Sequence, residues 1–152
     1  MYYLGIDPGF SGAWGLIDHN GKYLGCDDLP HDGTKILTQA AIDAILPLLH
    51  PVDHVEIILE SVHAMPGQGV SSTFKFGVAF GGALALAERI EGTCTLISAR
   101  TWKKMMGLSS DKDQSLVMAR ELWPEAPLSR KKDNGRAEAL LLAEWGRRNF
   151  EI

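Results

Sequence analysis

Zinc-binding and disulfide patterns are missing from this sequence of 152 residues, which has only two cysteines, Cys26 and Cys94. No cysteine or histidine spacing is of the zinc type, so a bound metal must be held by oxygen ligands. We expect that no signal peptide is present and that no apolar run is long enough to cross a bilayer. We therefore expect one domain, residues 1–152, in the reducing cytoplasm of a bacterium or a phage-infected cell, away from membranes and organelles.

An overall excess of positive charge is also missing, because the net charge is −4, which is unusual for a general nucleic-acid binder. The distribution is uneven. Residues 1–100 carry five Lys/Arg against eleven Asp/Glu (net −6), whereas residues 101–152 carry ten against eight (net +2). A basic half can bind phosphate, and the residues we expect to do so are Lys75, Lys103, Lys104, Arg130, Lys131, Lys132 and Arg136. Two alternatives stay open: lysines that only solvate helix faces, and pairing of Arg136 with Glu138 or Asp133.

Apolar periodicity and turn residues divide the chain into an ordered set of strands and helices. We predict strands over residues 2–7, 13–18, 23–26, 55–60 and 93–97, and helices over 34–49, 71–90, 101–107, 112–122 and 132–149. Three strands followed by alternating helices and strands is the order of an RNase H-like α/β fold. The expected architecture is a five-stranded mixed sheet flanked by helices.

Acidic residues stand where such a sheet would bring them together. Asp7 closes the first strand, Glu60 closes the fourth, and Glu138 lies near the start of the last helix with Asn134 one turn before it. A carboxylate at the end of a buried strand is costly unless it has a partner, and a cation is a natural one. The arrangement therefore indicates magnesium and phosphate chemistry, in which two ions activate a water and stabilise a leaving oxygen.

Other acids compete for the same role. Glu56 alternates with apolar neighbours, and Asp27-Asp28 follows the third strand. We rank the Asp27-Asp28 pair lower because the third strand lies farther from the centre of the expected sheet.

The segment after Glu60 contains Pro66, Gly67 and Gly69, which indicates a mobile loop beside the acidic site. Met65, Gln68 and Phe74 could wedge into or hydrogen-bond unpaired bases of a nucleic acid. An ordinary flexible connector is the alternative.

The helix expected over residues 71–90 is rich in glycine and alanine, and glycine costs a helix roughly 1 kcal/mol relative to alanine. Close approach to the sheet or to a second helix would explain such small residues. The helix is therefore a candidate dimer interface, and burial against the chain's own sheet fits its composition equally well.

Several blocks of sequence occur in a characteristic order. They are Gly5-Ile6-Asp7-Pro8-Gly9 with Ser11-Gly12-Ala13, Trp102-Lys103-Lys104 with Gly107-Leu108, Ser110 to Ser115 with Leu122-Trp123-Pro124, and Lys131 to Leu141. Together they resemble the RuvC-type Holliday junction resolvases, in particular the phage and chloroplast branches. The resemblance runs nearly from end to end of the chain.

This resemblance implies a homodimeric, magnesium-dependent endonuclease that resolves four-way DNA junctions by paired nicks, with Mn²⁺ as a substitute for Mg²⁺. It also implies four metal-binding and catalytic positions, Asp7, Glu60, Asn134 and Glu138. Asp7 would bridge two ions, Glu60 would complete one site, and Glu138 with residue 134 the other.

One position departs from the family pattern. Residue 134 is usually aspartate or histidine in related proteins, whereas Asn134 offers only a neutral carbonyl oxygen, a weaker magnesium ligand. Three explanations stay open: Asp133 acts in its place, the site is a natural weak-metal variant, or the residue was changed to silence cleavage. We favour the last.

Other functions compatible with the sequence belong to different classes. A phosphotransferase of the actin and sugar-kinase type also begins with a strand-end aspartate and glycines, but its two domains need a far longer chain. A protein that binds branched DNA without cutting it would fit Asn134. A third possibility is a nuclease of the same fold that acts on flaps or RNA–DNA hybrids.

Overall fold

In the computed structural model, which describes residues 1–150, five strands form one mixed sheet in the order β3-β2-β1-β4-β5. The strands are β1 (Tyr2–Asp7), β2 (Ala13–Asp18), β3 (Tyr23–Asp28), β4 (Val55–Ser61) and β5 (Thr93–Ser98). The first three pair antiparallel, whereas β4 is parallel to both β1 and β5. This is the predicted RNase H-like sheet.

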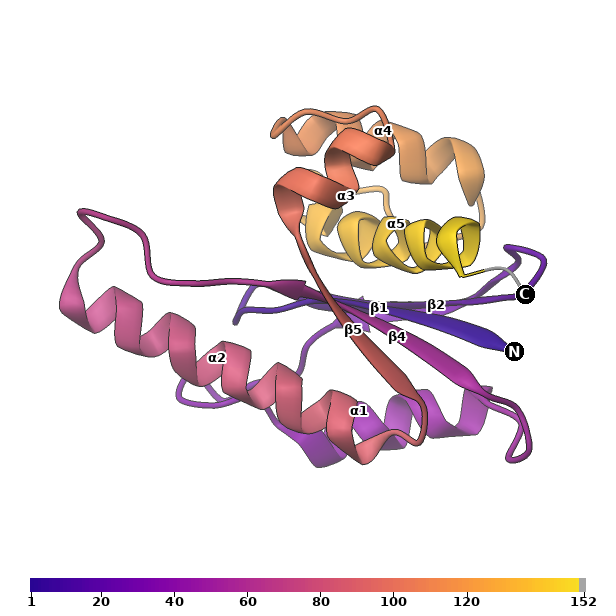
Figure 1. Cartoon of the computed structure of the whole chain (residues 1–152), viewed down its shortest axis with the longest axis horizontal. Coiled ribbons are helices and arrows are strands. Elements are labelled where there is room, and N and C mark those ends of the chain that lie inside the picture. Colours follow the sequence, from indigo (N-terminus) through magenta and orange to yellow (C-terminus); the bar gives the residue numbers. More distant parts are fainter. Residues whose placement is uncertain (151–152) are drawn as a thin grey trace.

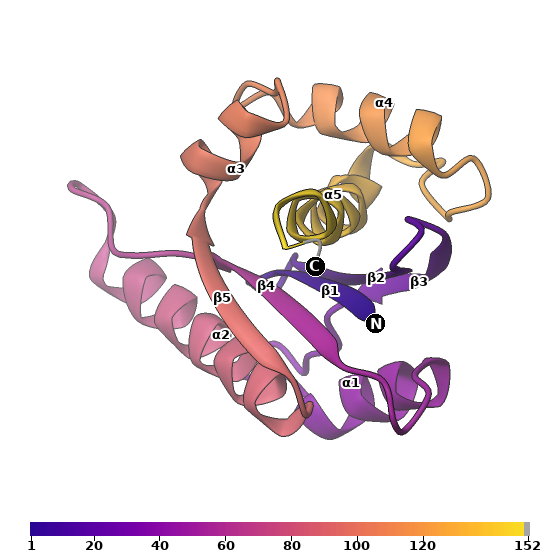
Figure 2. The same cartoon turned by 45° about the vertical axis from the view of Figure 1, so that its right-hand side comes forward.

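Helices cover both faces of the sheet (Figures 1 and 2). The α-helices are α1 (Thr38–Ile45), α2 (Val70–Arg89), α3 (Ala99–Met105), α4 (Lys112–Leu122) and α5 (Asn134–Asn149), and two 3-10 helices are η1 (Leu46–Leu48) and η2 (Lys131–Asp133). Helices α3, α4 and α5 lie on one face, and α1 and α2 on the other. Each strand alternates between the two cores: Tyr3 packs on the α5 side and Leu4 on the α1–α2 side.

The first helix is shorter than the predicted 34–49, because local polar contacts fix its start. Asp32 accepts hydrogen bonds from the backbone N–H groups of Thr34 and Lys35, which holds these residues in a turn. The α-helix begins at Thr38 and gives way after Ile45 to η1, which contains Pro47. Strand β3 is longer than predicted and runs to Asp28.

Helix α5 lies very close to β1 and β2, at two glycines. A Cβ atom added to Gly15 would lie 2.7 Å from the backbone nitrogen of Leu140, and one added to Gly5 would overlap the carbonyl oxygen of Ala139. Any larger residue would push the helix away from the sheet. These glycines therefore set the short distance between α5 and the strands β1 and β2.

Helix α2 packs on α1 and β4 through Ala79, Ala83, Leu86 and Ala87, while its N-terminal half projects beyond the sheet (Figure 1). By length and composition alone, its 20 residues could cross a membrane, with a mean hydropathy of 1.3 over the best window. The expectation that no segment of the chain is long and apolar enough for this was therefore wrong. Such a helix is weak evidence of a membrane span, because core helices pass the same test.

We predict that Gly5→Ala lowers the free energy of unfolding by about 2 kcal/mol or more, because the new methyl group meets the backbone of α5. Gly25→Ala in β3 is the matched control, because its nearest neighbour is the flexible side-chain end of Leu48. Urea unfolding of both variants measures the difference. Equal stabilities of the two variants would show that the packing of α5 on β1 does not require glycine at position 5.

Candidate metal site

Three carboxylates from three elements meet on the α5 side of the sheet. Asp7 ends β1, Glu60 lies one residue before the end of β4, and Glu138 lies near the start of α5. Because β1 and β4 are neighbours and parallel, their carboxyl ends lie at one edge of the sheet. One carboxylate oxygen of each residue lies within 4.8 Å of the corresponding oxygens of the other two. The convergence that a shared metal site requires is therefore present.

The acids that we ranked lower lie elsewhere. Glu56 contacts His54 at 2.8 Å, and Asp27 and Asp28 bind Arg136. Among the described residues, the acidic cluster that could hold a metal consists of Asp7, Glu60 and Glu138.

A pocket of about 290 Å³ opens at the three carboxylates. Two cations reach it, Lys103 and Lys112, and its remaining wall consists of Pro8, Gly9, Phe10, Ser11, Gly12, Val62 and Phe76. A second pocket of about 380 Å³, between Leu46 and Glu91, lies near the opposite end of β4 and shares no residue with the first. The acidic pocket thus combines oxygen ligands with two positive side chains.

The carboxylates of the pocket carry more negative charge than their surroundings stabilise. Burial raises the pKa of Asp7 well above its ordinary value, and the nearby charges of Glu60 and Glu138 raise it further, while Lys112 and Lys103 act in the opposite direction. Burial also raises the pKa of Glu60, against a hydrogen bond from Trp102 that lowers it. Such a cluster favours a divalent cation, which would relieve the repulsion between the carboxylates.

Neighbouring side chains orient two of the three acids. The indole Nε1 of Trp102 donates to Oε2 of Glu60 at 3.1 Å, and the hydroxyl of Ser115 donates to Oε1 of Glu138 at 3.3 Å. The ammonium of Lys103 lies 2.7 Å from the same Oε1. Trp102, Lys112 and Ser115 were not predicted as site residues, because only the packing of α3 and α4 brings them to the pocket.

Lys103 was predicted as a phosphate contact. The structure places it in a different environment: its side chain is 11% exposed and it is paired with Glu138. Its charge is thus partly neutralised within the cluster. Any contact of Lys103 with a nucleic acid would have to occur inside the pocket.

The residues before Glu138 show whether Asp133 could take the place of Asn134 in the metal site. The carboxylate of Asp133 is bound by Arg130 and is buried away from the acidic cluster, so Asp133 does not act in place of Asn134. Within residues 1–150, the side chain of Asn134 has no hydrogen-bond partner. At Gly135 a Cβ atom would lie 3.7 Å from Oδ2 of Asp7, so the first turn of α5 lies directly beside this carboxylate.

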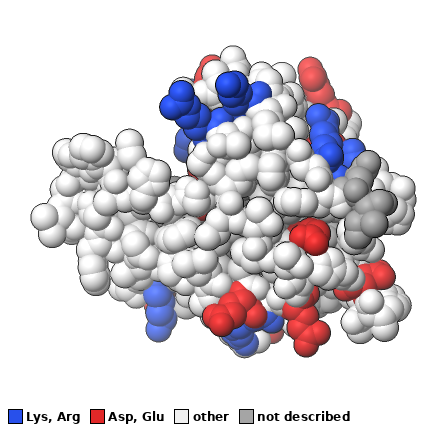
Figure 3. Space-filling model, in the orientation of Figure 1, with Lys and Arg blue, Asp and Glu red and all other residues white. Residues whose placement is uncertain are grey.

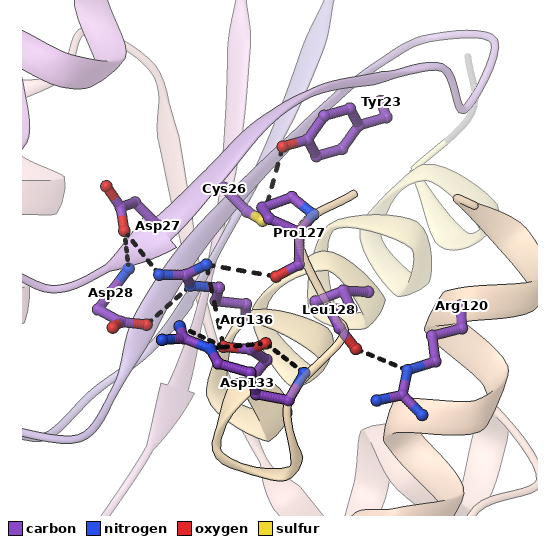
Figure 4. Close-up of polar contacts among 10 residues, drawn as sticks. Tyr23, Cys26, Asp27, Asp28, Arg120, Pro127, Leu128, Asp133 and Arg136 are labelled. Carbon is purple, nitrogen blue, oxygen red and sulfur yellow. Dashed lines mark hydrogen bonds and ion pairs between the residues drawn. The ribbon is translucent and has the colours of Figure 1, made fainter. Parts of the chain in front are cut away.

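Two arginines predicted to contact phosphate are held in ion pairs, and those of Arg136 are shown in Figure 4. Arg130 binds Asp133 with a shortest distance of 2.7 Å. Arg136 binds Asp28 at 2.9 Å and Asp27 at 3.1 Å, and lies 3.9 Å from Asp133. The alternative that pairs Arg136 with Asp133 is thus partly met, although the main partners are Asp27 and Asp28.

The remaining predicted nucleic-acid contacts lie on the surface. Met65 is 62% exposed and Phe74 75% exposed, at the loop and helix that project beyond the sheet. Gln68 accepts a hydrogen bond from the backbone of Met65, which closes this loop. Lys75 lies over the ring of Phe10, a residue of the acidic pocket. The start of α2 therefore adjoins the candidate metal site.

The exposed cations are unevenly spread. Lys104, Lys131 and Lys132 are exposed, and they belong to α3 and η2 on the α5 side of the sheet. In Figure 3, lysine and arginine gather mainly over the upper, helical layer, whereas aspartate and glutamate dominate the lower edge. The charge asymmetry of the sequence is thus also present on this face of the molecule.

Comparison with solved structures gives the class of the domain. The chain is similar to the structure of "T. thermophilus RuvC in complex with Holliday junction substrate", with a TM-score of 0.65 and 17% identity, over 97% of this chain and 95% of the other. A second Thermus thermophilus RuvC structure matches with a TM-score of 0.56 and 18% identity, over 97% and 96% of the two chains. The chain is therefore an RNase H-like α/β domain with the RuvC fold.

Sequence comparison adds a curated relative. Over 119 residues, 74% of this chain, the sequence is 34% identical to "Holliday junction resolvase MOC1, chloroplastic" of Chlamydomonas reinhardtii. The matched region is 14% of that protein, so the chain spans only a small part of the relative's length. No model of a known protein family matches the chain. The predicted resemblance to RuvC-type proteins is confirmed in sequence and in fold.

The raised pKa values predict how stability depends on pH in the absence of metal. Asp7 binds a proton more tightly in the folded than in the unfolded chain, so the folded protein loses stability as the pH rises from about 4 through the raised pKa. Asp7→Asn removes the ionisable group, and with it this loss of stability. We expect the metal-free variant to melt at least about 2 °C above the parent protein at pH 7, the shift that about 1 kcal/mol causes in a domain of this size.

The difference between Asp7→Asn and the parent protein should shrink as the pH falls towards 4, because Asp7 of the folded chain stays protonated and Asp7 of the unfolded chain begins to take up its proton near its ordinary pKa of 3.8. Thermal unfolding between pH 4 and pH 8 with a chelator present measures it. A variant less stable than the parent at pH 7 would contradict the charge imbalance proposed for the pocket.

Proposed function

We propose that this chain is a metal-dependent endonuclease that resolves four-way DNA junctions by symmetric paired nicks. The observation that carries the proposal is the meeting of Asp7, Glu60 and Glu138 on a RuvC fold. The resolvase named as a sequence relative, and the RuvC structure solved with a Holliday junction, support junction DNA as the substrate. We further propose Mg²⁺ as the metal, with Mn²⁺ as a substitute, and a cytoplasmic protein that does not enter membranes.

The donor set fits a hard divalent cation, because carboxylate oxygens are the ligands that Mg²⁺ prefers. Asp7, Glu60 and Glu138 would hold the metal, and Asn134 would add a neutral oxygen. Bound metal ions supply an activated water and stabilise the departing 3′-oxygen in phosphodiester hydrolysis. Trp102 and Ser115 keep Glu60 and Glu138 oriented towards the pocket.

The basic residues around the pocket have a separate role in this proposal. Lys103 and Lys112 lie at the carboxylates, where their charge would stabilise a phosphate drawn into the pocket. Lys104, Lys131 and Lys132 are exposed beside them and would bind the phosphates of the junction arms. Met65 and Phe74 would enter the open centre of the junction, where bases are least protected.

Two symmetric nicks require two active sites facing opposite strands, which a dimer with twofold symmetry provides. Helix α2 offers an interface, because one of its faces has no partner within residues 1–150. The face repeats at helical spacing and consists of Val70, Gly77, Gly81 and Leu84. A Cβ atom at Gly77 or Gly81 would meet nothing within 4 Å, whereas one at Gly82 would meet Ile36. The small residues of this face suit a second copy of α2.

The first test is a panel of labelled four-way junction, flap, RNA–DNA hybrid and duplex incubated with Mg²⁺ or Mn²⁺. We expect opposing nicks in the junction alone. Asp7→Ala should lower the rate by about 1,000-fold or more, because several kcal/mol of transition-state stabilisation are lost and each 1.36 kcal/mol is a factor of ten. Glu56→Gln, on the same strand as Glu60 but outside the cluster, should cut normally. Faster cutting of flaps or hybrids would change the substrate assignment.

A second candidate, a protein that binds junctions without cutting them, is favoured by the neutral Asn134. Cleavage rates of the parent chain and Asn134→Asp at fixed Mg²⁺ decide between the two. We expect Asn134→Asp to be the faster, because a carboxylate binds Mg²⁺ more strongly than an amide oxygen. Equal rates would remove Asn134 from the site, and tight binding without cleavage in both proteins would favour the second candidate.

The dimer is tested by Gly81→Glu, which places a carboxylate on the unpartnered face of α2. Sedimentation at micromolar concentration should show a dimer for the parent chain and a monomer for the variant. Ala44→Glu, an exposed position on α1, is the control and should stay dimeric. A parent chain that sediments as a monomer, with cleavage first order in protein, would contradict paired action.

A further inference from the structure

One ion-pair network joins the start of α5 to the end of β3, far from it in the sequence (Figure 4). The guanidinium of Arg136 donates through Nε to Asp28, through Nη2 to Asp27 and through Nη1 to the carbonyl of Pro127. Its side chain is only 14% exposed, whereas both acids are more than 60% exposed. The arginine is thus fixed on three sides, in the planar geometry that suits guanidinium better than ammonium.

The ion-pair network includes Asp28, which belongs to the row of residues that pair with Asp7 across β1, β2 and β3. Asp28 pairs with Ala13 across β3 and β2, and Ala13 pairs with Asp7 across β2 and β1. Arg136 therefore ties α5 to the same cross-strand row whose central member is a proposed metal ligand. Glu138 follows two residues later on the same helix, and Gly135 lies against Asp7.

A second ion pair fixes the segment immediately before the helix. Asp133 accepts hydrogen bonds from the backbone and the guanidinium of Arg130, and the side-chain bond from Arg130 is the main cause that lowers the pKa of this carboxyl. Asp133 also lies 3.9 Å from Arg136. Ion pairs with the end of β3 and within the segment around η2 therefore both fix the first turn of α5.

We propose that Arg136, with Asp27 and Asp28, is a positioning group for the metal site rather than a phosphate contact. By holding the first turn of α5 on the Asp7 row, it keeps Glu138 within metal-ligand distance of Asp7 and Glu60. The inference rests on the proposed function, because it assigns the network to the metal site of that function. It also explains why Arg136, which belongs to the basic part of the chain, pairs with two acidic residues.

The test measures two properties of each variant: Mn²⁺ affinity by calorimetry, and the salt dependence of binding to a four-way junction in a metal-free buffer. Arg136→Met should weaken Mn²⁺ binding by about 10-fold, the lower end of the range for residues that orient metal ligands. Arg136→Lys should recover part of this loss. Asp27→Asn/Asp28→Asn should resemble Arg136→Met, and the three changes combined should add little, since they remove one interaction.

Two controls separate positioning from other roles. Glu125→Gln, an exposed acid with no ion pair within residues 1–150, should bind Mn²⁺ as the parent chain does. Lys132→Ala should lower the salt slope of junction binding by about one unit, as expected of a phosphate contact, whereas Arg136→Met should leave the slope unchanged.

Each outcome decides between the alternatives. A salt slope that falls by about one unit in Arg136→Met with unchanged Mn²⁺ affinity would make Arg136 a phosphate contact and overturn the inference. Variants that are less stable but bind Mn²⁺ normally would reduce the network to a structural role. If Arg136→Met does not fold, the exposed pair Asp27→Asn/Asp28→Asn decides. A parent chain that binds no Mn²⁺ would instead overturn the proposed function, and the inference with it.

Discussion

The positions of the proposed metal ligands are set by the contact between α5 and two glycines, Gly5 in β1 and Gly15 in β2. Gly5 and Gly15 leave no room for a side chain between strand and helix, so the backbone of α5 lies directly on the sheet. This short distance places the first turn of the helix beside Asp7 and brings Glu138 to the carboxyl ends of β1 and β4. A proposed metal site built from two strands and a helix exists only because the helix can come this close.

The close packing of α5 on the sheet also brings the carboxylates of Asp7, Glu60 and Glu138 together. Their charges repel one another, and burial already opposes ionisation at this place. Lys103 and Lys112 offset part of the charge, and Trp102 and Ser115 donate hydrogen bonds. The remaining imbalance appears in the raised pKa values of Asp7 and Glu60. An arrangement that costs stability without a cation and gains it with one is what a metal site needs.

The sheet and the three acids could be predicted from sequence because their signals are local. Asp7 and Glu60 each close an apolar run, and Glu138 stands on the helix whose position the fold class fixes. The start of α1 was missed because Asp32 holds Thr34 in a turn, which competes with the helix.

Long-range pairings could not be predicted in the same way. Arg136 and Asp28 are 108 residues apart, and nothing in either neighbourhood indicates the other. The burial of Lys103 against Glu138 depends on how α3 packs on α5, and in the sequence Lys103 is indistinguishable from the exposed Lys104. Basic residues were therefore assigned to phosphate as a group, although the structure gives three of them acidic partners.

The central claim is that Asp7, Glu60 and Glu138 together hold a divalent cation. Crystals grown with Mn²⁺ and measured by anomalous diffraction test it most directly, because the metal is located without reference to activity. We predict an anomalous peak in contact with carboxylate oxygens of all three residues. Peaks confined to other acids, with the three carboxylates bound only by protein groups, would contradict it.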